Sequence, residues 1–451
     1  MGTITLQQAA AWCGGKIDPK YKDVTFRGAN NDTRKLASGE LFLALKGVRD
    51  GHDFIPAALE KGAAAVLCTH CEGDYPAIVV EDVRIALGQI AQQERLRLGC
   101  KVVAVTGSVG KSTTKEMIST VLGSTYRISK TPANHNNDIG MPMSILAMPE
   151  DTQIAVLEMG MNHFREIAYL SNIAKPDVAV IVNIGTMHIE HLGSMEGILQ
   201  AKLEILEGMG ADGQVILNGD DPLLWNLHKN MSEITYLGVN NSENQVLGVE
   251  IREQGEEISF CVQKPEPMRI TLPLQGVHHV VDALAAVAVG LKLQVTPEQI
   301  CQSLSSFRNM EGRQEIFEAG PYTIIKDCYN AGPESMAAAL DVLSKRAGRR
   351  VAVLGEMLEL GVCTAAEHYK VGRLAAERAD VVLAFGPSSD RVLKGAITGG
   401  MPDTRVSAYE DREKLVSALK QKAKPGDVLL FKGSHGMHME LILEAFLREE
   451  K

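Results

Sequence analysis

Apolar residues in this chain occur in short, nearly continuous runs rather than in strict alternation. Four such runs in the middle of the chain are VVAV (102–105), IAVLEM (154–159), VAVIVNIG (178–185) and QVILNGD (214–220). Continuous apolar runs of this length are typical of parallel strands that are buried on both faces of a sheet. The pattern predicts a doubly wound α/β sheet in the middle of the chain.

Two further units flank this central series. The first 98 residues indicate a small mixed domain, with strands at 41–47, 64–68 and 77–81 and a helix at 54–63. A third series begins near Gly312, with strand patterns YTIIKDCYN, RVAVLGEM, DVVLAFG and DVLLFKGS, each followed by a helical pattern. This arrangement predicts a second open, mostly parallel, Rossmann-like sheet. We therefore expect an α/β protein of three domains, at residues 1–98, 99–312 and 313–451.

Composition and charge agree with an ordinary globular protein. The chain has 451 residues, 45% of them hydrophobic and 23% charged, which suits about three domains of ~150 residues each. A net charge of -10 argues against a broad nucleic-acid or anionic-membrane surface, so a polyanionic ligand must meet locally placed cations. No apolar run approaches the ~18 residues of a membrane span, and the start of the chain does not resemble a secretory signal. We expect a cytoplasmic protein without a membrane span or a nucleic-acid partner.

The eight cysteines are scattered, which is typical of free thiols in a reducing compartment. Cys68 and Cys71 form a C-x-x-C pair, but no second ligand pair accompanies them as a zinc site requires. We interpret them as two small buried thiols at the end of a strand.

The stretch TGSVGKSTTK (106–115) follows the strand VVAV and precedes a helical pattern. It matches the phosphate-binding pattern G-x-x-x-x-G-K-[ST], except that Val105 stands where that pattern has its first glycine. Gly107 and Gly110 would let the backbone approach phosphates, Lys111 would reach the β and γ phosphates, and the Ser112 hydroxyl would bind magnesium. The sequence predicts a nucleotide site with a shortened loop.

Two later strand ends carry further candidate ligands. Glu158 ends the strand IAVLEM, at the carboxyl edge where open α/β sheets bind their ligands, and it could complete a magnesium site opposite the loop serine. His188 lies just past VAVIVNIG, in the segment HIEH. A zinc site there lacks the helical context of an HExxH motif, so we favour a magnesium or substrate role for His188 and a structural role for His191.

Together, these motifs resemble the Mur ligases of peptidoglycan synthesis. The stretches that carry the resemblance are TGSVGKSTTKEM, TPANHNNDIGMP, LEMGMNHFREI, NIGTMHIEHLGS, AKLEI, QGVHHVVDALAA, MEGRQEI, DCYNAGPESM and FKGSHGMHME. They cover nearly the whole chain, and that family uses the short TGxxGK[ST] loop, which accounts for Val105. NNDIG followed by MP, together with DCYNAGPESM, favours the branch that joins D-alanyl-D-alanine to UDP-N-acetylmuramoyl-tripeptide.

The resemblance implies a reaction through an acyl phosphate. ATP phosphorylates the carboxylate of the nucleotide-linked peptide, and the amine of the dipeptide attacks it through a tetrahedral intermediate. Two magnesium ions are implied, together with carbamylation of Lys202, which would otherwise be interpreted as a solvated helix lysine. The matched catalytic residues are Lys111, Glu158, His188 and Lys202, and the matched metal ligands are Ser112, Glu158, His188 and Lys202.

The same matching predicts the contacts to the substrates of a monomeric enzyme. ATP contacts are expected from Thr106, Gly107, Ser108, Val109, Gly110, Lys111, Ser112, Thr113, Asn183, His279, Arg313, Asp327, Tyr329 and Asn330. Contacts to the UDP-linked peptide and the dipeptide are expected from Thr33, Arg34, Gly47, Asp50, Thr131, Asn136, Asn137 and Lys432. Without the resemblance, Arg313 would be a charge on a linker surface. The third residue of the acceptor peptide, lysine or diaminopimelate, stays open.

Some positions depart from the family pattern. His279 and Asp282 stand where asparagine is usual, Val109 replaces a frequent loop asparagine, and His435 and His438 stand where arginine is frequent. His279 can still donate or accept one hydrogen bond. No predicted phosphate or metal ligand is missing, so we expect an active enzyme.

Two other interpretations remain open at this point. A sister ligase that adds a single amino acid, or a folylpolyglutamate-type synthase, would share the loop, Glu158, His188 and Lys202. An inactive nucleotide-binding partner protein would bind ATP without turnover, and it would be expected to lack a metal ligand.

Overall fold

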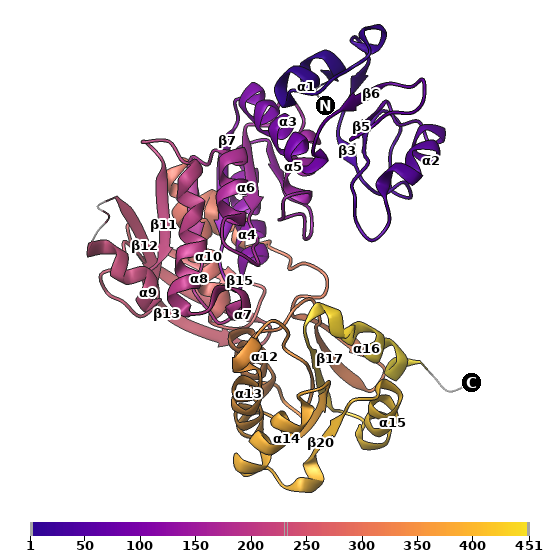
Figure 1. Ribbon diagram of the computed structural model, residues 1–451. Helices are drawn as coiled ribbons and strands as arrows, with labels where there is room; N and C mark the ends of the chain where they lie inside the picture. Colours follow the sequence, from indigo (N-terminus) through magenta and orange to yellow (C-terminus); the bar gives the residue numbers. More distant parts are fainter. Residues whose placement is uncertain (1–2, 230, 232, 449–451) are drawn as a thin grey trace.

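The computed structural model describes residues 3–229, 231 and 233–448, and it divides into three units along the chain (Figure 1). The N-terminal unit carries a two-stranded sheet, β1 and β2, and a parallel four-stranded sheet in the order β3-β4-β5-β6. The elements of this unit are β1 Ile4–Thr5, α1 Leu6–Cys13, β2 Thr25–Phe26, β3 Ala29–Asn30, β4 Leu41–Leu43, α2 Ile55–Glu60, β5 Ala65–Cys68, β6 Ala77–Val79 and α3 Val83–Leu98.

The central unit is built on a nine-stranded sheet in the order β15-β14-β13-β12-β11-β10-β7-β9-β8. Its strands are β7 Lys101–Thr106, β8 Ile128–Lys130, β9 Ile154–Glu158, β10 Val178–Ile181, β11 Gln214–Asn218, β12 Ile234–Gly238, β13 Val246–Gln254, β14 Glu257–Lys264 and β15 Met268–Leu272. The strands from β8 to β13 pair in parallel, whereas β13, β14 and β15 form an antiparallel extension. The parallel strands β7, β9, β10 and β11 were predicted, whereas β8, β12 and the antiparallel extension were not.

Helices cover both faces of the central sheet. They are α4 Lys111–Gly123, α5 Gly140–Leu146, α6 Glu166–Ala174, α7 Ile189–Leu192, α8 Met195–Leu203, α9 Pro222–Trp225, α10 His278–Lys292 and α11 Pro297–Ser305. Val102 and Ala104 of β7 pack in one core with α3 and α5, whereas Val103 and Val105 pack in the other core with α4 and α10. Since successive strand residues point to opposite faces, a continuous apolar run is what a strand covered on both sides requires.

The C-terminal unit is a six-stranded sheet in the order β16-β17-β21-β18-β19-β20, in which β16 alone of the described strands is antiparallel to its neighbour. Its elements are β16 Glu315–Ala319, β17 Tyr322–Asp327, α12 Pro333–Ser344, β18 Arg350–Gly355, α13 Thr364–Arg378, β19 Val381–Phe385, α14 Ser389–Thr398, β20 Val406–Tyr409, α15 Arg412–Lys422, β21 Val428–Lys432 and α16 Met439–Leu447. β17 ends at Asp327 and β21 at Lys432, and both residues line one cavity together with the loop that follows β7, so the site forms between the two sheets.

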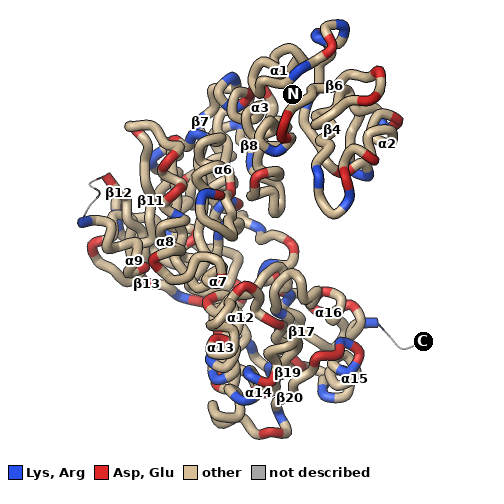
Figure 2. Tube along the Cα trace, in the orientation of Figure 1, with Lys and Arg blue, Asp and Glu red and all other residues tan. Residues whose placement is uncertain are grey.

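The distribution of surface charge, the absence of an apolar span among the described helices and the state of the cysteines can be compared with the expectations from composition. In Figure 2, basic and acidic segments are intermixed over all three units. Among the described residues, no helix has the length and apolar composition to cross a bilayer. All eight cysteines are free, but Cys71 is exposed, because it lies in the turn beyond β5; the prediction of two buried thiols holds for Cys68 only.

Candidate active site

The phosphate loop is a tight turn between β7 and α4. The strand continues through Val105, which is fully buried, so the loop begins only at Gly107. It closes at Gly110, whose φ of 83° lies in the left-handed region, directly before α4. A Cβ atom at Gly110 would lie 2.8 Å from Oδ1 of Asp282, so the close approach also requires glycine there.

The loop is held by Asn183, which follows β10. Its Oδ1 accepts hydrogen bonds from the amides of Ser108 at 3.0 Å and Val109 at 2.9 Å, and its Nδ2 donates to the carbonyl of Val109 at 2.9 Å. Lys111 folds back so that Nζ donates to the carbonyls of Gly107 at 2.8 Å and Ser108 at 3.2 Å. The amides of the first turn of α4 have no helical partner, which leaves them available to phosphate oxygens.

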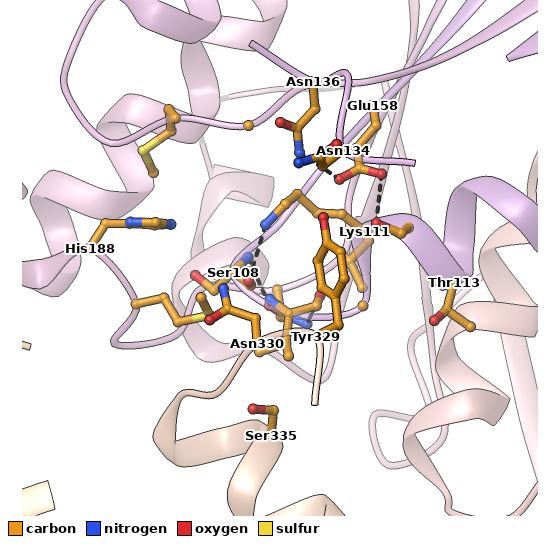
Figure 3. Close-up of a pocket in the computed structure, with 18 of the residues that line it drawn as sticks. Ser108, Lys111, Thr113, Asn134, Asn136, Glu158, His188, Tyr329, Asn330 and Ser335 are labelled. Carbon is orange, nitrogen blue, oxygen red and sulfur yellow. Dashed lines mark hydrogen bonds between the residues drawn. The ribbon is translucent and has the colours of Figure 1, made fainter. Parts of the chain in front are cut away.

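A buried network joins the loop to β9 and to the C-terminal unit (Figure 3). The hydroxyl of Ser112 donates to Oε2 of Glu158 at 2.7 Å, and Nη2 of Arg313 donates to that hydroxyl at 2.8 Å. Nδ2 of Asn136 donates to the other carboxylate oxygen of Glu158 at 2.8 Å. Nε of Arg313 is buried without a hydrogen-bond partner among the described residues. A buried guanidinium with an unused donor suits an anion such as phosphate.

Lys115 belongs to this network and was not predicted. It is fully buried one helical turn after Lys111, with Nζ 2.8 Å from the carbonyl of Thr131 and 3.7 Å from Oε2 of Glu158. The hydroxyl of Thr131 accepts from the amide of Glu158 at 3.0 Å. Thr131, predicted to contact the acceptor peptide, thus lies fully buried behind Glu158, where its hydroxyl holds the backbone of that residue.

His188 lies at the start of α7 with a positive φ of 65°. Its Nδ1 is 2.5 Å from Oε2 of Glu359, a residue of the C-terminal unit, at ion-pair distance but without hydrogen-bond alignment. Burial lowers the pKa of His188, and Glu359 opposes this effect. With Nδ1 against the carboxylate of Glu359, the other ring nitrogen, Nε2, is the atom of this imidazole that can act as a metal ligand.

Lys202 lies in the last turn of α8 and is 1% exposed. Burial, and secondarily the charge of Lys111, hold the pKa of Lys202 well below the ordinary value of lysine. None of the hydrogen bonds or ion pairs described for the chain includes its Nζ. The structure therefore replaces the solvated helix lysine that the sequence alone suggested with a buried amine that favours the neutral form.

The nucleotide motif of the C-terminal unit stands beside the loop. The guanidinium carbon of Arg313 lies 3.9 Å from the ring centroid of Tyr329, which orients the arginine by a cation–π contact. Nζ of Lys432 donates to Oδ2 of Asp327 at 2.6 Å and to the carbonyl of Asn330 at 3.0 Å. Lys432 is 2% exposed, so its charge is used to hold the DCYN segment.

The two residues near the start of α10 that depart from the family pattern, His279 and Asp282, also have polar partners within this region. Nε2 of His279 lies 3.1 Å from Oε1 of Gln314, and its Nδ1 lies 3.4 Å from Oδ2 of Asp282. Asp282 in turn accepts from the hydroxyl of Thr114 at 2.8 Å. These contacts link α10, α4 and the segment after Arg313, so two of the departures from the family pattern, His279 and Asp282, belong to one connected polar cluster.

One cavity of about 990 Å³ collects most of the predicted residues, with walls from all three units. The predicted residues that line it are Ser108, Val109, Gly110, Lys111, Ser112, Thr113, Asn136, Asn137, Glu158, Asn183, His188, His279, Arg313, Asp327, Tyr329, Asn330 and Lys432. Thr106, Gly107 and Lys202 lie behind this wall. The size and the mixed polar lining suit more than one substrate.

The residues predicted to bind the uridine nucleotide are not brought into this cavity. Arg34 is exposed and paired with Asp32 at 2.8 Å, and Asp50 caps the turn Gly51–Phe54 by accepting from the amide of His52 at 3.0 Å. Thr33 and Gly47 lie in the same unit, away from the described cavity wall. An extended substrate would have to span both places.

Two acidic residues of the C-terminal unit were missed. Oε1 of Glu334 accepts from the amide of Thr186 at 2.9 Å and from its hydroxyl at 3.1 Å, and Glu359 contacts His188. Both follow strand ends, which is the only signal in the sequence that could have indicated them. They bring the C-terminal unit against the segment that follows β10.

Comparisons with known proteins match this chain to one family over nearly its whole length. Three family descriptions match: "Mur ligase family, catalytic domain" over residues 25–95, "Mur ligase middle domain" over 105–290 and "Mur ligase, glutamate ligase domain" over 312–435. The chain is 40% identical to the UDP-N-acetylmuramoyl-tripeptide–D-alanyl-D-alanine ligase of Bacillus subtilis, covering 96% of this chain and 95% of that protein.

Solved structures give the same result. MurF from Acinetobacter baumannii matches with a TM-score of 0.91 at 32% identity, over all of both chains. MurF ligase from Thermotoga maritima, solved in complex with ADP, matches with a TM-score of 0.82 at 29% identity, over 93% of this chain and 97% of that one. The three-unit architecture is therefore shared with these proteins.

Proposed function

Because this chain belongs to the Mur ligase family, we propose that it joins D-alanyl-D-alanine to UDP-N-acetylmuramoyl-tripeptide with the energy of ATP. Full-length relatives carry that activity in their names, and a related structure holds ADP. The observation that carries the proposal is the contact of Arg313 with Ser112, because it places a C-terminal arginine on the phosphate loop inside a cavity that three domains enclose.

The residues of the chain mainly position and neutralise the reactants. Lys111, the amides that begin α4 and Arg313 bind the phosphates of ATP, so that the γ-phosphoryl group transfers to the terminal carboxylate of the tripeptide. The free amine of the dipeptide then forms the amide bond as phosphate leaves. Orientation of bound reactants can contribute ~7 to 11 kcal/mol toward such a barrier.

Magnesium fits the donor set at the loop. Ser112 and Glu158 offer hydroxyl and carboxylate oxygens 2.7 Å apart, and the described residues contain no cluster of three or more His, Cys, Asp or Glu that could hold a metal alone. Magnesium commonly binds to one or two carboxylates together with substrate phosphates, so an incomplete protein cage is what it requires. The ion would neutralise phosphate charge, with Ser112 and Glu158 holding one ion and His188 and Lys202 a second.

Carbamylation of Lys202 fits the burial of its amine. A neutral amine can add carbon dioxide and release one proton, which converts a buried base into an anionic oxygen ligand. The charge of Lys111, which disfavours a protonated Lys202, would favour the carbamate. We propose this modification as part of the active enzyme.

The remaining parts of the proposal concern the molecule as a whole. We propose a monomer that acts in the cytoplasm without nucleic acid. The eight free cysteines support the reducing compartment, and the intermixed surface charge supports the absence of a nucleic-acid partner. We also propose domain boundaries near residues 98 and 312. The four-stranded sheet lies before the first boundary, the nine-stranded sheet lies between the two, and the six-stranded sheet follows the second.

Phosphate release tests the proposal. ATP and magnesium are supplied with UDP-N-acetylmuramoyl-tripeptide, with and without D-alanyl-D-alanine, and the product mass is measured. We expect release only with both, and a product heavier by the dipeptide. Release with UDP-N-acetylmuramoyl-dipeptide and a single amino acid would instead identify a sister ligase, and ATP binding without release would identify an inactive partner protein.

A further inference from the structure

The cavity extends beyond Glu158 to a wall that contains none of the residues predicted to bind ATP. This wall is formed by the start of α3, by the loop 134–138 and by the segment that leads into α6. In Figure 3, Asn134 and Asn136 lie beside Glu158, on the opposite side of Lys111 from Asn330 and Ser335. This part of the wall therefore lies across Lys111 from these two residues of the C-terminal unit.

An ion pair stands on this wall. Nη1 of Arg84 lies 3.1 Å from Oδ2 of Asp138, and the two side chains are 51% and 40% exposed. Among the described residues, the guanidinium of Arg84 and the carboxylate of Asp138 form no other hydrogen bond or ion pair. Most guanidinium donors and the second carboxylate oxygen are thus available to a ligand.

Apolar side chains flank the pair. Ile85 is 54% exposed and Phe164 is 40% exposed, and both line the same cavity. Large exposed apolar residues inside a cavity suit the methylene groups of a ligand. The other charged groups of the wall have partners of their own: Asp82 caps α3, Arg165 pairs with Glu207 at 2.6 Å, and Glu166 accepts from the amide of Asn162 at 2.7 Å. The wall therefore offers an apolar surface next to the Arg84–Asp138 pair.

The pair also lies within reach of the reacting carboxylate. Asp138 is two residues after Asn136, whose Nδ2 is 2.8 Å from Glu158, and two residues span at most about 7 Å. A side chain that begins next to the reacting carboxylate can therefore end at the pair.

We propose that Arg84 and Asp138 bind the side chain of the third residue of the acceptor peptide, and that this residue is a 2,6-diaminopimelate rather than lysine. This inference rests on the proposed function, in which the carboxylate of that residue is activated beside Glu158. The side chain of diaminopimelate ends in an ammonium and a carboxylate, which match Asp138 and Arg84 respectively. A lysine side chain would satisfy only Asp138 and leave Arg84 without an anion.

The test compares kcat/KM for UDP-N-acetylmuramoyl-tripeptides that carry meso-2,6-diaminopimelate or L-lysine, with D-alanyl-D-alanine as the second substrate. We expect the unmodified protein to prefer diaminopimelate by about 10- to 100-fold, the effect of one hydrogen-bonded charge. Arg84→Gln should abolish this preference by lowering kcat/KM for diaminopimelate only. Asp138→Asn should lower kcat/KM for both substrates, because both carry the ammonium. Arg127→Gln, which removes an exposed arginine paired with Asp151 at 3.0 Å outside the cavity, is the matched control and should change neither value.

The outcomes separate this inference from the function on which it rests. Equal use of the two tripeptides, preference for lysine, or a preference that survives in both Arg84→Gln and Arg84→Met would overturn the inference alone. Absence of dipeptide-dependent phosphate release with either tripeptide would overturn the proposed function and the inference together.

Discussion

Nη2 of Arg313 and Oγ of Ser112, which belong to different domains, lie 2.8 Å apart. The same serine hydroxyl donates to Glu158 at 2.7 Å, so the arginine reaches the atoms proposed to hold ATP and magnesium. Because Arg313 follows the last helix of the central domain, small changes in the angle between the domains would move it away from the loop. The contact therefore couples domain closure to completion of the site.

Replacement of Arg313 should weaken catalysis more than binding. We expect Arg313→Ala to lower kcat by about 100-fold or more, as removal of one preorganised donor to transition-state charge commonly does. Arg313→Lys should recover only part of the activity, because lysine lacks the planar group that stacks on Tyr329 at 3.9 Å. Steady-state phosphate release measures both variants. Arg308→Ala removes a nearby arginine that bonds only a backbone carbonyl and should stay within twofold; an equal loss there would contradict the assignment.

Removal of the Lys202 amine should abolish ligation in a way that added acid partly reverses. In Lys202→Ala, a short carboxylic acid can occupy the space of the carbamate and supply its oxygen. We expect no measurable ligation without the acid and partial recovery with it, measured as phosphate release across acid concentrations. A folded Lys202→Ala protein, judged by circular dichroism, that no short acid rescues would count against the carbamate.

The buried amine of Lys202 should also make stability depend on pH in a defined direction. Its pKa is lowered in the folded protein, so between that pKa and the ordinary value of lysine the unfolded state binds more protons, and stability rises with pH. Lys202→Met removes this cost and should be more stable than the unmodified protein near pH 7, by an amount that shrinks toward pH 10. Urea unfolding at several pH values measures this difference.

Bicarbonate offers an independent readout of the same group. If the folded protein forms the carbamate and the unfolded chain does not, bicarbonate should raise the melting temperature of the unmodified protein, but not that of Lys202→Met. An equal rise in both proteins would show that bicarbonate acts elsewhere.

The hydrogen bond beneath the phosphate loop should contribute measurably to stability. Thr114→Val keeps the shape of the side chain but removes the hydroxyl that donates to Asp282 at 2.8 Å, leaving a buried carboxylate oxygen with one partner fewer. We expect a loss of about 1–3 kcal/mol in the free energy of unfolding. Thr120→Val on the same helix removes only a bond to its own helix carbonyl and should change stability by about 0.5 kcal/mol or less.

Much of the fold could be predicted because the positions of apolar residues along the sequence match the positions that are buried in the structure. The apolar run at 102–105 appears as the two-face-buried strand β7, and the glycines at 107 and 110 mark the turn that follows it. The antiparallel extension β13, β14 and β15 was missed, since its strands alternate buried and exposed residues and no motif directs attention to them.

The sequence by itself determined the phosphate loop, the positions of Glu158 and His188 at and just after strand ends, and the family resemblance, because short motifs encode turns and strand ends directly. Only the tertiary structure decided that Lys202 is a buried amine, that Lys432 is held by Asp327, and that Glu334 and Glu359 face the central domain. The reason is physical: the pKa and the partner of a charged side chain depend on which groups surround it, and residues about 90 positions or more away in the chain supply those groups.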